Sequence, residues 1–205
     1  MVAQSLKERI IENALDLFRH KGYHGVSVDE IVETAGTSKG GFYHKFKSKD
    51  ALLYEIHDVF ISKVLKETKK AYDENVSPID KVCAMLYAFT NVFDVYQRHI
   101  TVFYDESAYL PAEYKAIIKE KRTEYRKLIE QVIEDGKNSG HFRPEISTTI
   151  TTMAIIGLVN WTYKWYRQNG TLTMEQITLH FNDLILRGIM TEHGLNEAME
   201  KKYVL

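Results

Sequence analysis

The chain is predicted to be an all-α protein of about nine helices, because apolar residues recur at intervals of three and four along most of its length. Its three prolines, Pro78, Pro111 and Pro144, fall at breaks between periodic segments, and no stretch alternates as a strand does. With 205 residues and 44% hydrophobic content, the chain can bury a sizeable core as one or two domains. Helices are expected over residues 3–21, 28–35, 39–46, 49–72, 78–98, 111–138, 146–168 and 173–191, with a frayed tail over 196–205.

Capping residues place the first helices. Apolar residues at helical spacing give the first helix one buried stripe, and Gly22 should end it. Ser27 is a natural N-cap and Glu30 completes a capping box, so the second helix should begin at Val28. Gly36 should end that helix in the left-handed conformation. The next two helices follow capping serines of their own, Ser38 and Ser48.

Two short helices joined by a turn that contains glycine are typical of a helix-turn-helix. Residues 34–49, which hold the turn and the second helix, carry four lysines and His44 but no acid. In a chain whose net charge is −1, this local positive charge indicates a surface for the phosphates of nucleic acid. A basic surface helix with no partner is the alternative interpretation.

In a helix-turn-helix the N-terminal residues of the second helix lie at the base edges. Lys39 is the side chain there that could donate to guanine O6 and N7, while Gly41 could permit close backbone approach. Tyr43, His44 and Lys49 should reach the phosphate backbone. Together with the capping serine, the candidate DNA-binding residues are Ser27, Thr37, Ser38, Lys39, Gly40, Gly41, Tyr43, His44 and Lys49.

A specific set of residues runs through positions 10–55. It consists of Ala14, Phe18, Gly22, Tyr23 and the block SVDEIVETAGTSKGGFYHKFKSKDALL at 27–53, with its Phe42-Tyr43-x-x-Phe46-x-x-Lys49 spacing. In these residues the segment resembles the DNA-binding domain of the TetR family of bacterial transcriptional regulators. The resemblance implies a DNA-binding domain over 1–48 and a ligand-binding and dimerisation domain over 49–205, with the helix 49–72 as connector. It also implies that the candidate residues above touch operator DNA.

The last two expected helices, 146–168 and 173–191, carry apolar residues over more than one face. Such a helix needs two partners, so we expect a second copy of the chain to cover the outer face. The resemblance implies the same arrangement, since the last two helices form the TetR-family dimer as a four-helix bundle. The candidate interface residues are Ile155, Val159, Ile177, Phe181, Leu184 and Ile185.

Aromatic residues are frequent after residue 85, where they either fill the core or line a ligand pocket between helices. The candidate ligand-binding residues are Phe89, Phe93, Tyr96, Phe103, Tyr104, Tyr125, Asn160, Trp161 and Trp165. The stretch 157–166, Gly-x-x-Asn-Trp-x-x-x-Trp-Tyr, is similar to the last domain of TetR-type regulators of fatty-acid and steroid catabolism, whose ligands are acyl-CoA thioesters. A planar cationic or aromatic drug is the competing ligand, because it could pair with Asp94, Asp105 or Glu106.

These observations predict a homodimeric, ligand-responsive repressor that binds double-stranded operator DNA. A small hydrophobic effector such as an acyl-CoA is expected to release it. A repressor of an efflux gene that responds to drugs or aromatic ligands is the first alternative. A helical adaptor that binds only proteins, without DNA, is the alternative from another class.

Other functional classes lack their motifs. No HExxH, GxSxG, P-loop or dinucleotide-binding pattern occurs, so we expect no enzyme and no cofactor. His20 and His24 are four apart, but Gly22 interrupts the helix between them, so no metal site is expected. The single cysteine, Cys83, excludes an intrachain disulfide. The N-terminus has no apolar signal segment and the longest apolar run, 153–159, is too short for a bilayer, so a cytoplasmic protein is expected.

Overall fold

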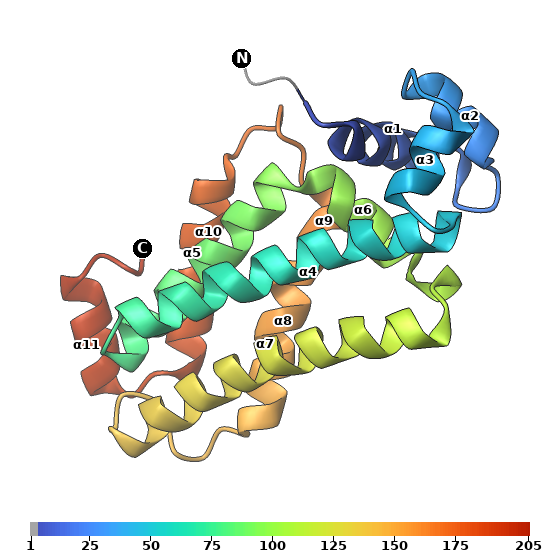
Figure 1. The fold of residues 1–205 in the computed structure, drawn as a ribbon. Coiled ribbons are helices and arrows are strands. Elements are labelled where there is room, and N and C mark those ends of the chain that lie inside the picture. The colour runs from blue at the N-terminus through green and yellow to red at the C-terminus, as the bar shows by residue number, and fades with distance from the viewer. Residues whose placement is uncertain (1–3) are drawn as a thin grey trace. The chain divides into compact units, whose positions relative to one another are not determined.

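The computed structural model describes residues 4–205, which form helices and no strand, and this confirms the predicted all-α fold (Figure 1). Among these residues, Phe142 and Met190 form an isolated antiparallel bridge. The helices are α1 (Leu6–Lys21), α2 (Val28–Thr34), α3 (Lys39–Lys45), α4 (Lys49–Glu74), α5 (Pro78–Val95), α6 (Gln97–Asp105), the 3₁₀ helix η1 (Ser107–Tyr109), α7 (Ala112–Asn138), α8 (Thr148–Asn160), α9 (Thr162–Trp165), α10 (Met174–Ile189) and α11 (Glu192–Glu200).

The first helices begin and end where their capping residues predict. The hydroxyl of Ser27 accepts a hydrogen bond from the backbone N–H of Glu30 at 3.1 Å and so begins α2 as predicted. The second half of the predicted capping box does not form, because the Glu30 carboxylate pairs with Lys21 instead. Gly36 follows α2 with a φ of +60°, a conformation that glycine adopts without strain. The hydroxyl of Ser38 caps α3 in the same way as Ser27 caps α2. The predicted start of the first helix at residue 3 lies outside the described residues.

Two long helices predicted from the sequence are interrupted in the structure. The segment 146–168 divides at Trp161 into α8 and the single turn α9. The chain then becomes extended at Tyr166, whose hydroxyl donates to the carboxylate of Asp94 on α5 at 2.8 Å. The segment 78–98 likewise divides at Tyr96 into α5 and α6. Apolar periodicity continues through both breaks, so it did not predict them.

The prediction of a frayed tail over 196–205 is wrong. Helix α11 continues to Glu200, and the residues after it are held by acids on two other helices. The ammonium of Lys201 donates to both carboxylate oxygens of Asp80 at 2.9 Å, and the Tyr203 hydroxyl donates to the same group at 3.0 Å. The backbone N–H of Leu205 donates to Asp183 at 2.9 Å. Asp80 therefore acts as an anchor for the end of the chain.

Contacts between residues divide the chain into two compact units. Unit 1 contains the residues up to Ile61 together with Tyr96–Glu120, and unit 2 contains Ser62–Val95 together with Lys121–Leu205. Helices α4 and α7 contribute residues to both units. The boundary between the two units thus falls within α4, after Ile61. The division into functional domains after residue 48 stays a prediction.

In unit 1, helix α1 packs against α2, α3 and α6. Phe42 and Phe46, the aromatic residues of the motif around α3, are both buried, with ring centroids 5.6 Å apart. This core gives α3 a fixed inner face and leaves its outer face to solvent. Other fully buried side chains of this unit include Ile10, Leu15, Phe18, Ile31, Leu52 and Ile56.

In unit 2, helix α10 packs along α5 and also contacts α8 and α11 (Figure 1). The buried hydroxyls of Thr90 and Thr178 lie 2.7 Å apart and join α5 to α10. Cys83 is buried on α5, and burial raises the pKa of its thiol to about 12. A thiol that stays protonated is a poor nucleophile, so Cys83 is a packing residue.

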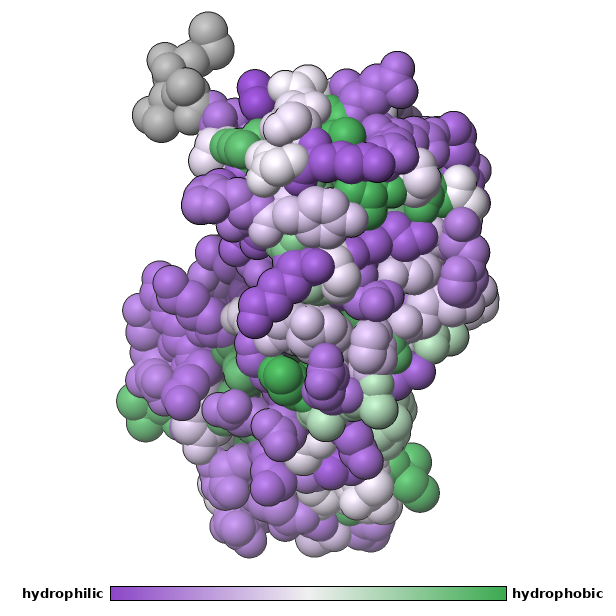
Figure 2. All heavy atoms as spheres, turned by 45° about the vertical axis from the view of Figure 1, so that its right-hand side comes forward, coloured by the Kyte–Doolittle hydropathy of each residue, from purple (hydrophilic) through white to green (hydrophobic). Residues whose placement is uncertain are grey.

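The surface seen in Figure 2 is mainly hydrophilic, with apolar residues in small separate groups. Large exposed apolar side chains on α8 to α10 include Ile150, Met153, Trp161 and Leu184. Of the helices formed by residues 4–205, none is both long enough and apolar enough to cross a membrane.

Gly136→Ala should destabilise unit 2. A Cβ at Gly136 on α7 would clash with the fully buried ring of Phe142. Overpacking of this kind should lower the free energy of unfolding by roughly 1–3 kcal/mol, measured by chemical denaturation. In the control Gly40→Ala, the added Cβ meets only the Ser38 hydroxyl at 3.6 Å, so stability should not fall. Equal stability of the two variants would contradict the packing described.

Candidate nucleic-acid interface and ligand cavity

The outer side of α3 is exposed at most positions predicted to meet DNA. Ser38, Lys39, Gly40, Tyr43 and His44 are exposed, with 53% of Tyr43 accessible. Ser27 is also exposed, whereas Thr37, Gly41 and Lys49 are half-buried. The turn and the first two turns of α3 therefore present one continuous polar surface.

Lys39 is already paired on this surface. Its ammonium lies 2.7 Å from a carboxylate oxygen of Asp29 on α2, and the hydrogen bond with Asp29 raises the pKa of Lys39. Both side chains are exposed, so the pair is weak and can exchange for another partner. A guanine or phosphate that binds Lys39 has to compete with Asp29, which sequence reasoning did not consider.

Gly41 lies close against the side chain of Thr37 in the turn. A Cβ at this position would lie 2.5 Å from the hydroxyl oxygen of Thr37. The absence of a side chain thus lets α3 begin close against the turn residue Thr37. This local reason accounts for the glycine without any contact to a base.

Lys49 is tied to the backbone of its own unit. Its ammonium donates to the carbonyls of Tyr23 at 2.9 Å and of Val26 at 2.8 Å, and it lies 4.1 Å from the centroid of the Tyr23 ring. Partial burial lowers the pKa of Lys49. Two of its three N–H groups are therefore used within the protein. Lys49, which was predicted to contact phosphate, thus holds the loop that contains Tyr23 and Val26. The sequence contains no local signal for this long-range bond.

Tyr23 connects the loop before α2 to two other parts of unit 1. Its hydroxyl is hydrogen-bonded to Asp50 in the first turn of α4, and its ring stacks on Tyr109 of η1 with centroids 5.9 Å apart. The ring of His24 makes an edge contact with Tyr109, with ring centroids 4.3 Å apart. Burial, followed by the bond to Asp50, raises the pKa of Tyr23 above its ordinary value. The loop that leads to the helix-turn-helix is thus fixed by α4 and η1 together.

Helix α6 is tied to α1 by charge. The guanidinium of Arg98 pairs with Glu12 and lies 3.1 Å from a carboxylate oxygen of Asp16. Of α6, only Gln97 and Arg98 lay within a predicted helix, and this ion pair joins residues more than eighty positions apart. Arg98 therefore belongs to the framework of unit 1.

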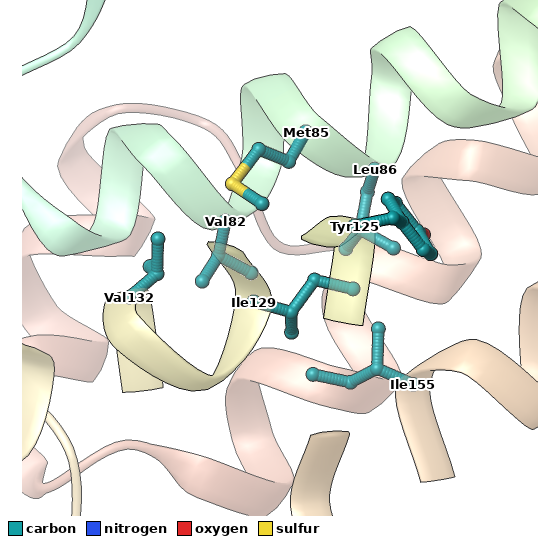
Figure 3. A pocket seen from close by; sticks show the side chains of 7 residues that line it. All are labelled: Val82, Met85, Leu86, Tyr125, Ile129, Val132 and Ile155. Atoms are coloured by element: carbon teal, nitrogen blue, oxygen red, sulfur yellow. The ribbon is translucent and has the colours of Figure 1, made fainter. Parts of the chain in front are cut away.

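An apolar cavity lies in unit 2 between α5, α7 and α8 (Figure 3). About 300 Å³ of space lies within it when the open solvent at its mouth is counted, whereas its cavity volume proper is only about 20 Å³. The side chains from the three helices point toward one another around it, and none of them is charged. Such a space suits an apolar group of a ligand. The lining residues are Val82, Met85, Leu86, Tyr125, Ile129, Val132 and Ile155.

The nine predicted ligand-binding residues do not gather at this cavity. Tyr125 lines it, and Phe89 stacks on Tyr125 with centroids 5.4 Å apart, backed by Phe93 at 5.2 Å from Phe89. The remaining aromatic residues lie elsewhere: Tyr96, Phe103 and Tyr104 belong to unit 1, Trp161 and Trp165 are exposed, and Asn160 is half-buried beside them in sequence. The aliphatic residues of the lining were missed because aliphatic spacing looks the same in a core and in a pocket.

The six predicted interface residues separate into two groups. Leu184 is 61% exposed and Phe181 is half-buried, so both are open to a partner. The outer face of α8 carries a different set of exposed apolar residues, namely Ile150, Met153 and Trp161, with the small Gly157 between them. Their helical spacing is visible in the sequence, although they were not predicted as interface residues. The remaining four residues are buried within the chain itself: Ile155, Val159, Ile177 and Ile185.

Comparison with known proteins gives matches over nearly the whole chain. Residues 10–56 match the family described as bacterial regulatory proteins, tetR family. Residues 75–189 match a second profile, described as tetracyclin repressor-like, C-terminal domain. The HTH-type transcriptional repressor KstR2 of Mycobacterium tuberculosis is 23% identical over 189 residues, which cover 92% of this chain and 94% of KstR2.

Solved structures have the same fold. KstR2 of M. tuberculosis, a ketosteroid transcriptional regulator, superposes with a TM-score of 0.85 at 23% identity, covering 93% of this chain and 97% of its own. The TetR-family regulator PfmR of Thermus thermophilus superposes with a TM-score of 0.82 at 27% identity. The match covers 87% of this chain and 97% of PfmR. AibR, solved in complex with isovaleryl coenzyme A and operator DNA, superposes with a TM-score of 0.77 at 24% identity. The match covers 91% of this chain and 98% of AibR.

Lys49→Met should destabilise unit 1. The substitution keeps the apolar stem of the side chain but removes the charged donor from the carbonyls of Tyr23 and Val26. Loss of hydrogen bonds to a charged group should lower the free energy of unfolding by roughly 1–3 kcal/mol in urea denaturation. The matched control is Lys47→Met, since Lys47 is exposed, and its effect should stay within about 0.5 kcal/mol. Equal values for the two variants would show that the internal bonds of Lys49 contribute nothing.

Proposed function

Because the chain belongs to the TetR family of bacterial regulatory proteins, we propose that it is a homodimeric repressor that binds operator DNA and is released by a hydrophobic effector. The observation that carries the proposal is the helix-turn-helix α2–α3, whose second helix has a buried aromatic inner face and an exposed cationic outer face. A transcriptional regulator acts where the chromosome is, so the proposed location is the cytoplasm.

On the DNA side, we assign α3 to the major groove with its N-terminal end at the bases. Ser38, Lys39 and Gly40 are exposed there, and Tyr43 and His44 follow on the same helix. Lys39 would leave Asp29 for a guanine, and phosphates would be bound by hydroxyl, imidazole and ammonium groups around it. The remaining proposed contacts are Ser27, Thr37, Gly41 and the third N–H of Lys49.

The proposed dimer uses the outer faces of α8 and α10. Leu184 on α10 and Ile150, Met153 and Trp161 on or beside α8 are large apolar side chains left in solvent. Exposed apolar groups of this size on neighbouring helices are typical of a protein interface. A second copy of the chain would bury them and present two α3 helices to the two halves of one operator.

For the effector, we infer a ligand with an apolar acyl chain. The cavity between α5, α7 and α8 has an uncharged, mainly aliphatic lining, which supports an acyl group over a cationic drug. AibR, a structural neighbour, binds isovaleryl coenzyme A, and this supports the acyl-CoA class for the present chain. In the alternative, a neutral aromatic ligand would fill the same cavity and regulate an efflux gene.

Release would follow from a shift between two arrangements of the protein. The effector must bind the arrangement that does not fit DNA more tightly, by a coupling free energy of roughly 1–3 kcal/mol. Helices α4 and α7 have residues in both compact units, and α7 also lines the cavity, so we infer that occupancy of the cavity would affect the DNA-binding unit through these two helices.

The first test is binding to a duplex from the promoter region of the protein's own gene, measured by fluorescence anisotropy. Affinity should fall steeply with salt, because phosphate contacts release counterions. Lys39→Ala should weaken binding by roughly 1–3 kcal/mol. Lys69→Ala is the control, since Lys69 is an exposed lysine of unit 2. No binding to this duplex, or equal affinity of both variants, would contradict the proposed DNA contact.

The dimer is tested with Leu184→Glu. A charge in the centre of the proposed interface should convert the dimer to a monomer in multi-angle light scattering and should also remove tight operator binding. Val76→Glu is the matched control, because Val76 is 94% exposed in the loop before α5. A Leu184→Glu protein that stays dimeric would move the interface away from this face.

The effector is tested by adding acyl-CoAs of increasing chain length to the protein–operator complex. Release should depend on chain length, and native mass spectrometry should detect one ligand class in the protein. Met85→Trp should fill part of the cavity and blunt release while leaving operator binding intact. Val76→Trp serves as the exposed control. Release by all acyl-CoAs alike, unchanged in Met85→Trp, would place the effector elsewhere.

A further inference from the structure

Three side chains that commonly bind metals meet where the loop after α7 reaches α11, within unit 2. His141 lies in the loop, and His193 and Glu197 lie one turn apart on the same face of α11. One ligand atom from each residue lies within 4.8 Å of those from the other two. Nε2 of His141 and Oε2 of Glu197 are already 3.2 Å apart. Ligands of tetrahedral zinc, with bonds of roughly 2.0–2.1 Å, lie about 3.3–3.4 Å apart.

The ring of His141 turns Nε2 toward the cluster and Nδ1 toward Ser139. Nε2 lies 3.2 Å from the carboxylate oxygen of Glu197, and without a metal ion Nε2–H can donate to that oxygen. Nδ1 lies 2.7 Å from the hydroxyl of Ser139, which also lies 3.2 Å from the carbonyl of Gly136. A metal ion on Nε2 would replace its proton, and Nδ1–H would then donate to Ser139. An imidazole whose second nitrogen donates to a fixed group is the usual arrangement around a metal.

The backbone holds the loop and the helix together at this point. The N–H and the hydroxyl of Thr191 both reach the carbonyl of His141, at 2.9 and 3.2 Å. Gly194 lies so close to the same carbonyl that any side chain there would clash. The distances among the three ligand residues are therefore set by the fold before an ion binds.

We propose that His141, His193 and Glu197 bind a divalent transition-metal ion of the Zn²⁺ type, with water as the fourth ligand. Two imidazoles and one carboxylate favour Zn²⁺ over Mg²⁺ and Ca²⁺, which prefer oxygen ligands. The other carboxylate oxygen of Glu197 is 2.9 Å from Lys201, which orients the group, and the exposed His193 opens the site to solvent. The bound ion ties α11 to residues 139–143, and this inference does not depend on the proposed regulatory function.

The test is a zinc titration of full-length, tag-free protein that has first been stripped with a chelator. Calorimetry should show about one ion per chain for the wild type, and the Co²⁺-substituted protein should show the absorption of a tetrahedral site. His193→Ala should bind more than tenfold more weakly, and Ser139→Ala about tenfold more weakly through loss of the bond that positions His141. Zinc should raise the thermal midpoint of the wild type and leave that of His193→Ala unchanged.

His180→Ala is the matched control, because His180 is an exposed histidine of the same unit that lies on α10. It should bind zinc as the wild type does. Circular dichroism of each variant without metal should show unchanged helix content, since both replaced histidines are exposed. Absence of zinc binding by the wild type at micromolar metal, or equal binding by His193→Ala, would overturn the proposal and leave a proton between His141 and Glu197.

Discussion

The bond from the Lys49 ammonium to the carbonyls of Tyr23 and Val26 is the constraint on which the geometry of unit 1 depends. These carbonyls lie in the loop that ends one residue before Ser27, the cap of α2, so Lys49 fixes the point at which the helix-turn-helix begins. The first turn of α4 adds the bond from Asp50 to the Tyr23 hydroxyl, and η1 adds the stacked ring of Tyr109. Helices α2 and α3 are thereby fixed to α4 and η1 as one body.

This arrangement separates the two physical functions proposed for the chain. The outer face of α3 carries exposed charge, and its base-reading candidate, Lys39, is held in a weak pair with Asp29 that DNA can displace. The cavity of unit 2 has the opposite character, with aliphatic walls and no charged side chain among those that line it. Charge at one surface and an apolar space in the other unit are what a DNA-binding regulator with a hydrophobic effector requires.

The sequence predicted features whose partners are close along the chain, whereas it did not predict contacts between distant residues. The caps at Ser27 and Ser38 and the glycine after α2 were readable, because a cap and its partner lie three residues apart. The double role of Lys49 was not, since its acceptors lie 23 and 26 residues away. Helical periodicity also does not say which apolar face meets the core, so Ile155 and Val159 were expected at an interface and lie inside the chain. The histidine cluster was missed because its members are far apart along the chain, with His141 lying 52 residues before His193.

Hydrogen exchange of the full-length protein, with and without operator duplex, tests the central claim most directly. If α3 reads DNA from a body fixed by Lys49 and Tyr23, the duplex should slow exchange at residues 38–44. It should also slow exchange in the loop 22–27 and around Tyr109, because these segments are joined to α3 within one unit. Unchanged exchange at 38–44 in a saturated complex would contradict the account. Slower exchange at 38–44 alone would show that the loop and η1 do not act with α3 as one body.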